Sequence, residues 1–273
     1  MEIFETLFKR GFAVALVVVV VVCLLLLGFQ RSLMYYPRGY SGKRVEESGA
    51  RQLRYFLVGE GEQVAFLLGE DELPDRIWVF CSGNGALALD WVSFVSSFDD
   101  SSVGFCLFEL PGYGLSAGSA EPSSVRESMQ QLRGALAEAY SVSVEEVDAR
   151  VCFLGHSIGA ATALIGAEEF GAKRLVLIAP FTTMTEMAQL SVGWPLCLLN
   201  LHRYDNRARL RSLRERGGKA TVFHGTADGL IPVKMSRELE AEFTEQVSLT
   251  EIEGAGHNDV IDRASAEIRA AIR

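Results

Sequence analysis

Short strand-like segments recur along the chain from residue 52 to residue 252. The first two, residues 52–57 and 63–68, flank a Gly-Glu-Gly turn and predict an antiparallel hairpin. Six further segments alternate with polar or glycine-rich turns and helical patterns: residues 77–80, 103–108, 151–154, 175–178, 220–223 and 247–252. Continuous apolar strands are typical of a parallel sheet that helices cover on both faces. We therefore expect one doubly wound α/β domain over residues 51–273.

The segments between the predicted strands have helical periodicity. Val125, Met129, Leu132, Leu136 and Tyr140 follow one another at spacings of four, three, four and four residues, which places them on one face of a helix. Apolar positions between residues 260 and 272 follow the same period, and an alanine-rich stretch follows the segment 151–154. These helices are the layers expected to cover the sheet.

Residues 182–206 depart from this alternation, because they are rich in methionine and leucine and contain no strand pattern. The segment follows a predicted strand and so lies above the carboxyl edge of the sheet, where ligands bind in such folds. Two interpretations stay open. The segment forms either helices packed on the core or a lid that lines an apolar acyl pocket.

The most apolar part of the chain is residues 11–29, a run of 19 residues without a charge. At about 1.5 Å per residue it spans roughly 28 Å, the hydrocarbon thickness of a bilayer. A cleaved signal peptide is the alternative, but its apolar region is shorter. The sequence favours a retained, single-pass anchor, with residues 1–30 as tip and membrane helix and residues 31–50 as a stalk.

The residues around the predicted anchor bear on its setting. Basic residues flank it on both sides, and although more of them follow it, long domains cross membranes largely regardless of charge, so the side of the membrane stays open. Tyr35, Tyr36 and Tyr40 follow the run and suit the headgroup region of a bilayer.

Charge and composition exclude several classes of function. The net charge of −9 argues against a nucleic-acid partner, and an arginine run between residues 207 and 216 resembles a solvated helix face. Five cysteines without a C-x-x-C pair and four histidines without ligand spacing predict neither disulfides nor a metal site. We expect a monomer without metal or cofactor.

Residues 155–159 read G-H-S-I-G, between an apolar strand and an alanine-rich helix. This is the strand, sharp turn and helix context in which the central serine becomes a nucleophile, which predicts that role for Ser157. Residues 114–118 also match G-x-S-x-G, but Gly118 and Pro122 prevent a helix from starting directly behind Ser116. Ser157 is the stronger candidate.

A serine nucleophile needs a histidine to take its proton and a carboxylate to orient that histidine. Downstream of Ser157, Asp228 follows the predicted strand 220–223 and His257 follows the strand 247–252. The order serine, acid, histidine is the one found on α/β-hydrolase folds. For the oxyanion hole we expect backbone N–H groups of Ile158 and Asn84, with Gly85 close behind Asn84.

Several segments together resemble the Bem46-like, membrane-anchored branch of the α/β-hydrolase superfamily. They are residues 30–37, 82–85, 111–116, 155–159, 224–228 and 256–258. The resemblance implies a serine hydrolase that acts on lipid esters or on acyl thioesters such as palmitoylated cysteines. In two places the chain departs from the family pattern: Ser82 stands where a histidine is usual, and Glu109 replaces a polar-aromatic pair. The missing histidine is expected to retune the oxyanion loop without abolishing catalysis.

The leading hypothesis is therefore a membrane-anchored esterase or thioesterase with a triad of Ser157, His257 and Asp228 and an acyl-enzyme intermediate. Its expected partners are a bilayer and a lipid or S-acylated protein substrate. A serine peptidase of the same fold and a non-catalytic membrane scaffold remain as alternatives.

Overall fold

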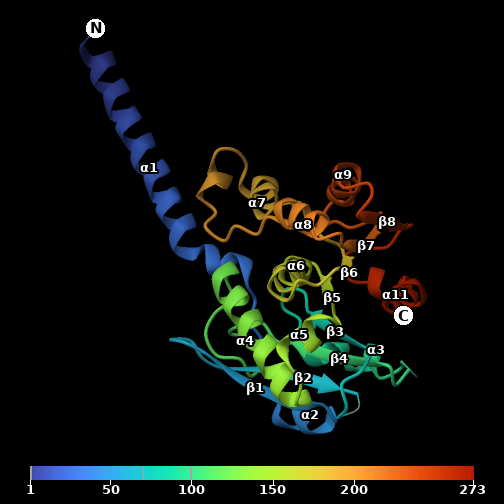
Figure 1. Cartoon of the computed structure of the whole chain (residues 1–273). Helices are drawn as coiled ribbons and strands as arrows, with labels where there is room; N and C mark the ends of the chain where they lie inside the picture. Colours follow the sequence, from blue (N-terminus) through green and yellow to red (C-terminus); the bar gives the residue numbers. More distant parts are fainter. Residues whose placement is uncertain (1, 70, 99) are drawn as a thin grey trace.

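The computed structural model describes residues 2–69, 71–98 and 100–273, so Met1 of the predicted tip lies outside the described residues. Eight strands form one sheet in the order β1-β2-β4-β3-β5-β6-β7-β8 (Figure 1). The pairs β1–β2 and β2–β4 are antiparallel and all others are parallel. The strands are β1 (Arg51–Leu57), β2 (Gly61–Leu68), β3 (Arg76–Cys81), β4 (Val103–Phe108), β5 (Val151–His156), β6 (Arg174–Ile178), β7 (Lys219–Gly225) and β8 (Val247–Ile252). The predicted hairpin and the mostly parallel sheet are confirmed.

Helices cover both faces of the sheet, and each face buries its own cluster of apolar side chains. One layer consists of α4 (Pro122–Tyr140), α5 (Val144–Asp148), α6 (Ile158–Phe170), α8 (Asn206–Glu215) and α9 (Lys234–Glu242). The other consists of η1 (Ala88–Trp91), α3 (Val92–Val95), α10 (Val260–Arg263) and α11 (Ser265–Ile272). The predicted apolar stripe of α4 is fully buried, and α6 lies between α4 and α8.

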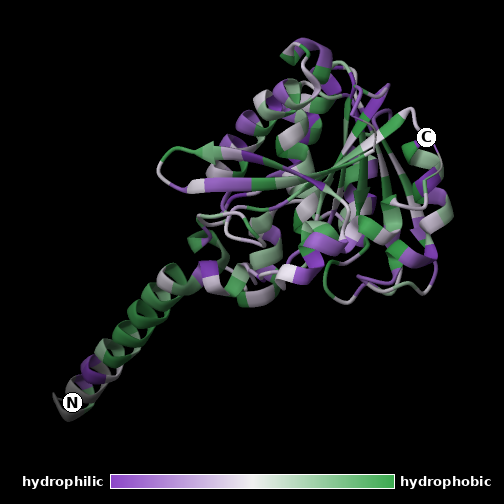
Figure 2. Ribbon diagram, turned by 90° about the horizontal axis from the view of Figure 1, so that it is seen from below, coloured by the Kyte–Doolittle hydropathy of each residue, from purple (hydrophilic) through white to green (hydrophobic). Residues whose placement is uncertain are grey.

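The helix α1 (Glu2–Met34) projects away from this body as a mostly apolar rod (Figures 1 and 2). Its apolar span covers Lys9–Met34, 26 residues, and no part of the most apolar window is buried inside the protein. The span is thus longer than the run 11–29 expected from the sequence. It is long and apolar enough to cross a membrane, a property that a signal sequence shares.

Polar contacts dock the end of α1 onto the body. Arg31 contacts Glu121 at 2.8 Å and Ser119 at 2.5 Å. Tyr35 is buried, with its hydroxyl 3.2 Å from Tyr204 Oη.

The expectation that all three tyrosines after the apolar run face lipid headgroups is therefore wrong for Tyr35. It is also wrong for Tyr40, which is half-buried and donates to the carboxylate of Glu109. Only Tyr36 is exposed. The short helix α2 (Gly42–Glu47) then leads into β1.

Residues 182–206, the lid segment, form an excursion above the sheet edge that contains α7 (Met184–Val192) and η2 (Leu196–Leu199). Its two ends are joined, because the Met184 N–H donates to the Tyr204 carbonyl at 2.8 Å and the Asn206 N–H donates to the Thr182 carbonyl at 3.0 Å. No residue of α7 is buried, but Met184 and Met187 are partly buried and pack against the core, so the helix lies on the surface of the core.

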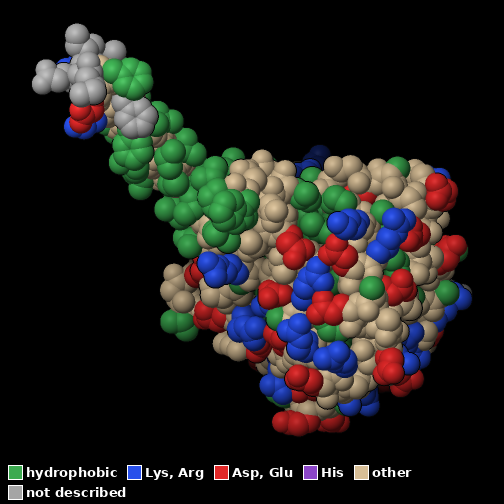
Figure 3. All heavy atoms as spheres, turned by 90° about the horizontal axis from the view of Figure 1, so that it is seen from above, with side chains coloured by type: hydrophobic (Ala, Val, Ile, Leu, Met, Phe, Trp, Pro, Cys, Tyr) green, Lys and Arg blue, Asp and Glu red, His purple; other side chains and the backbone are tan. Residues whose placement is uncertain are grey.

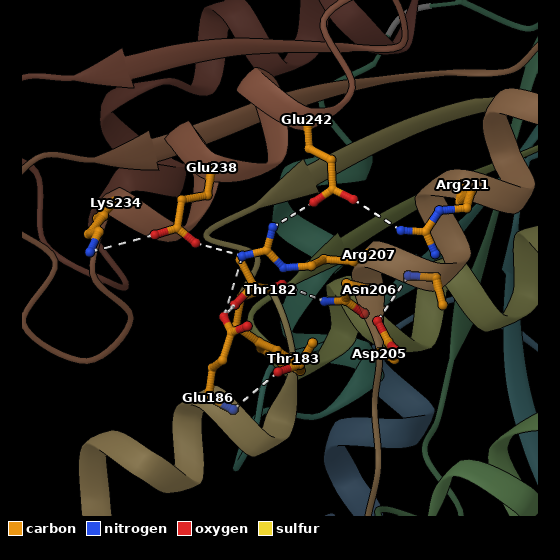
Figure 4. A network of polar contacts seen from close by, with 12 residues as sticks. Thr182, Thr183, Glu186, Asp205, Asn206, Arg207, Arg211, Lys234, Glu238 and Glu242 are labelled. Atoms are coloured by element: carbon orange, nitrogen blue, oxygen red, sulfur yellow. Dashed lines mark hydrogen bonds and ion pairs between the residues drawn. The ribbon is translucent and has the colours of Figure 1, made fainter.

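A charged network fixes the base of the lid segment (Figure 4). Arg207 on α8 lies 2.6 Å from both Glu238 and Glu242 of α9 and 3.6 Å from Glu186 of α7. The side chain is only 24% exposed. The arginine run is therefore more than a solvated helix face at this position, because Arg207 ties three helices together.

Candidate active site

The backbone at Ser157 is a strained turn between β5 and α6. Ser157 has φ 60° and ψ −123°, a conformation that costs about 1–3 kcal/mol for a residue with a side chain. The neighbouring glycines are required by space. A Cβ at Gly155 would lie 2.1 Å from the Gly159 carbonyl oxygen, and one at Gly159 would lie 2.1 Å from the Cys81 carbonyl oxygen. The local structure is the nucleophile elbow that the sequence predicts.

The two residues expected to form the oxyanion hole line one cavity together with Ser157. Ile158 is the first residue of α6, so its N–H group has no acceptor within the helix. Asn84, on the loop after β3, lines the same cavity as Ser157 and Ile158. The loop and the head of α6 approach each other closely, as the Gly159 contact requires. An anion bound above Ser157 would therefore face the positive end of the α6 dipole.

The second G-x-S-x-G serine has a different environment. Ser116 is buried, and its Oγ accepts a hydrogen bond from the Val64 N–H at 3.0 Å. No helix follows it directly, since α4 begins at Pro122. Ser116 joins its loop to β2.

Asp228 and His257 meet at the carboxyl edge of the sheet. The His257 Nδ1 and Asp228 Oδ2 atoms are 2.7 Å apart, and the Asp228 side chain is fully buried. Its other oxygen accepts from the N–H groups of Leu230 and Ile231, both at 2.8 Å. Burial alone would raise the pKa of Asp228, but hydrogen bonds from His224, His257 and the backbone outweigh it and lower the pKa well below its usual value. Asp228 is therefore favoured as a carboxylate.

The His257 loop has to cross back over the sheet, because β8 is three strands away from β5. It does so over Gly225, where a Cβ would lie 2.2 Å from the Ala255 carbonyl oxygen. The Ala227 N–H donates to the same carbonyl at 2.9 Å. The crossing brings the His257 ring centroid to 4.8 Å from that of His156, the neighbour of Ser157.

The structure thus joins Asp228 to His257 and places His257 beside His156, the neighbour of Ser157. Within the part of the chain that the structure describes, the Ser157 hydroxyl makes no hydrogen bond. Such bonds are often long before substrate binds and tighten in the complex.

Two histidines that the sequence reasoning set aside support this arrangement. His156 Nε2 lies 3.0 Å from the His257 carbonyl oxygen, so it donates there and holds the loop. Burial and the neighbouring His257 lower the pKa of His156 to about 4, which keeps it neutral. His224 Nε2 donates to the Ile231 carbonyl at 2.8 Å and lies 3.2 Å from Asp228. The sequence signal for these roles is position: His156 directly precedes Ser157, and His224 begins the H-G-T-A-D motif that contains Asp228.

The two departures from the family pattern both hold the oxyanion loop. The Ser82 hydroxyl donates to the Leu87 carbonyl at 3.2 Å and closes the loop on itself. Glu109 is buried beneath the loop and accepts from the Ala88 N–H at 3.2 Å and from Tyr40. Burial raises the pKa of Glu109 to about 7, against the lowering effect of these hydrogen bonds. Side chains other than a histidine therefore support this loop.

The side chain of Asn84 has a further role that sequence reasoning missed. Its Nδ2 donates to the Met34 carbonyl at 2.7 Å, and its Oδ1 accepts from the Tyr36 N–H at 3.0 Å. Tyr113 also donates to Oδ1, at 2.8 Å. The oxyanion loop is thus fastened to the last residues of α1.

A cavity of about 510 Å³ opens above Ser157. The lid segment supplies one wall, including Met184 and Met187 of α7, and the loop before α9 supplies Leu230. The opposite wall comes from α1, through Leu26 and Leu33 among others. The volume and the largely apolar lining suit an acyl chain or another apolar group of similar size.

Two uncharacterized proteins of Mycobacterium tuberculosis, MT2364 and Rv2307c, are each 28% identical to this chain over 181 residues. The similarity covers 66% of this chain and 62% of each relative, so the chain matches less than two thirds of their length.

Solved structures share the fold at lower identity. The Pyrococcus furiosus esterase Pf2001 is 13% identical, with a TM-score of 0.63 over 88% of this chain and 97% of that one. The thioesterase domain from the curacin biosynthetic pathway is 15% identical, with a TM-score of 0.54 over 82% and 99% of the two chains. The model of the Alpha/beta hydrolase family matches residues 78–235, more than half of the chain and including Ser157 and Asp228. The chain belongs to the alpha/beta hydrolase family and has its fold.

Proposed function

We propose that this hydrolase is a membrane-anchored serine esterase or thioesterase that cleaves acyl groups from lipids or S-acylated proteins. The observation that carries the proposal is the group of residues around the turn at the end of β5. There a strained serine faces an apolar cavity, and a histidine held 2.7 Å from a buried carboxylate lies beside it. Apolar α1 and the segment after it are the features that fit the Bem46-like branch.

In the proposed reaction, Asp228 accepts a hydrogen bond from the Nδ1–H group of His257, which leaves Nε2 unprotonated and free to act as a base. His257 takes the proton of Ser157 while Oγ attacks the acyl carbonyl. The N–H groups of Ile158 and Asn84 stabilise the oxyanion, a contribution of about 3–4 kcal/mol for each such donor. His257 then protonates the departing alkoxide or thiolate, and water cleaves the acyl-enzyme by the same steps.

Neutral His156 matters in this scheme because it lies beside the imidazole that becomes charged. A second imidazolium next to His257 would oppose protonation of that ring. Burial keeps His156 uncharged, so it holds the His257 loop without this penalty.

A substrate panel tests the proposed function directly. The full chain in phosphatidylcholine vesicles is given a long-chain monoacylglycerol, an S-palmitoylated peptide and an unacylated peptide, with Ser157→Ala as the control. We expect turnover of the ester or the thioester that is lost in Ser157→Ala. Faster cleavage of the peptide bond than of the ester or thioester would favour a peptidase. Wild-type rates no higher than those of Ser157→Ala would favour a scaffold.

A further inference from the structure

The helix that would tether the protein also forms part of its substrate cavity. Leu26, Gln30 and Leu33 of α1 line the same cavity as Ser157. Leu26 and Leu33 are seven residues apart, or two helical turns, so one stripe of α1 faces the cavity. A simple tether would need none of these contacts.

The depth of these residues follows from the length of the span. Its 26 residues extend about 39 Å, which exceeds a hydrocarbon core of roughly 30 Å by about six residues. With Lys9 and Arg10 at one headgroup layer, the other boundary falls near Gln30. Leu26 then lies about 6 Å inside the hydrocarbon, while Leu33 lies at headgroup level. The cavity wall therefore crosses the boundary between headgroups and acyl chains.

The lid segment exposes several apolar side chains. The most exposed apolar side chains there are Leu190, Trp194, Leu198 and Leu201, between 56% and 75% exposed. Contact between η2 and α1, and a hydrogen bond of 2.7 Å from the Leu201 N–H to Gln30 Oε1, hold this end of the lid segment beside Gln30. Figure 3 shows hydrophobic side chains continuing along α1 to the point where the helix meets the body.

We propose that the acyl chain of a bilayer lipid enters the cavity sideways from the membrane, between α1 and the lid segment, and lies along α1. The lid surface defined above rests in the same leaflet. The ester of such a lipid lies near the headgroup boundary, from which it would reach Ser157 in the same cavity. This inference deepens the proposed function and rests on it. It makes α1 a wall of the acyl site.

One test compares two tryptophan substitutions on α1. Leu26→Trp fills the cavity, whereas Leu24→Trp lies about 200° around the helix at nearly the same depth, where Leu24 is 62% exposed and does not line the cavity. Each full-length variant in phosphatidylcholine vesicles hydrolyses p-nitrophenyl palmitate, which resides in the bilayer, and p-nitrophenyl butyrate, which is soluble. The two probes share a leaving group, so the ratio of their rates reports the acyl site.

We expect Leu26→Trp to lower the palmitate-to-butyrate ratio at least tenfold, and Leu24→Trp to change it less than twofold. If Leu26→Trp and Leu24→Trp have the same palmitate-to-butyrate ratio, the proposed entry route is overturned, while hydrolysis itself is left intact. Wild-type protein that cleaves neither probe would contradict the proposed function instead.

A second test needs no activity. Trp194 is 75% exposed, whereas the other two tryptophans, Trp78 and Trp91, are buried. The fluorescence lost in Trp194→Phe therefore isolates the lid surface. In vesicles of phosphatidylcholine brominated on the upper acyl carbons, we expect that component to be quenched by half or more. A Trp194 component that bromine does not quench would place the lid surface in water and overturn the inference.

Discussion

Polar and apolar regions meet at Ser157 and are held in different ways. On the polar side, Asp228 accepts hydrogen bonds on both oxygens, and His156 and His224 fix the loops around it. On the apolar side, the cavity is lined largely by residues of α1 and the lid segment. Directional bonds can hold a reacting group within tenths of an ångström, whereas an apolar wall only has to exclude water and accommodate methylenes.

This contrast teaches where substitutions should matter. Changes on the polar side should act on the rate for every substrate. Changes on the apolar side should act on the choice between long and short acyl chains. The loop around Asn84 belongs to both, because it faces Ser157 with its backbone and fastens α1 with its side chain.

The largest effect is expected on the polar side. Asp228→Asn would place a donor opposite His257 Nδ1 and favour the wrong tautomer, so we expect kcat to fall about 10³- to 10⁴-fold for long and short esters alike. Asp205→Asn is a matched control, because Asp205 caps α8 by accepting from the Ala208 N–H and asparagine caps nearly as well. A similar loss of kcat in both variants would remove the assigned role of Asp228.

The next effect concerns stability and pH. Because the pKa of Glu109 is raised from 4.5 to about 7, the folded state favours its neutral form. The contribution of Glu109 to the free energy of unfolding is fully present below about pH 4.5, and it is lost as the pH rises through about 7. Glutamine cannot ionise, so the stability of Glu109→Gln relative to wild type should rise by about 2 kcal/mol between pH 5 and pH 8. Urea denaturation at both pH values measures it, and a difference that stays constant would show that Glu109 does not titrate in this range.

Asn84→Ala tests the junction of the two regions. The backbone N–H proposed for the oxyanion hole remains, but the side-chain bonds to Met34 and Tyr36 are lost. We expect kcat to fall about tenfold for both long and short esters, because a loosened oxyanion loop weakens stabilisation of the transition state. If only long-chain turnover falls, the side chain serves the acyl wall and not the loop.

The smallest effect is expected at the second G-x-S-x-G serine. Ser116→Ala removes the acceptor of the buried Val64 N–H and should cost about 1 kcal/mol of unfolding free energy. Its kcat should stay within about twofold of wild type. Loss of turnover in this variant without loss of stability would reopen the choice between the two serines.

Much of the polar side could be predicted because its signals are local. The glycines around Ser157 are required by a turn that five residues encode, Asp228 follows a mostly buried strand, and His257 follows a strand that alternates apolar and polar residues. Parallel strands bring their carboxyl ends to one edge, so the convergence follows once the strands are identified. The pattern of apolar residues predicted all eight strands.

The lid segment could be placed above the sheet edge from its sequence, but the α1 wall of the cavity could not be predicted in this way, because it depends on contacts between distant segments. Leu26 and Leu33 read as membrane-facing residues, and nothing in their own neighbourhood shows that they line a cavity with Ser157. Tyr35 and Tyr40 fit the composition of a headgroup belt but pair with Tyr204 and Glu109 inside the protein. The supporting contacts of His156 and of the Asn84 side chain likewise join residues that are far apart in the sequence.

The most direct test of the central claim is to label the full chain in vesicles with a fluorophosphonate and to map the modified peptide by mass spectrometry. The account predicts one adduct on Ser157, absent from Ser157→Ala and strongly slowed in Asp228→Asn. An adduct on Ser116 or any other residue, or labelling that persists in Ser157→Ala, would contradict it.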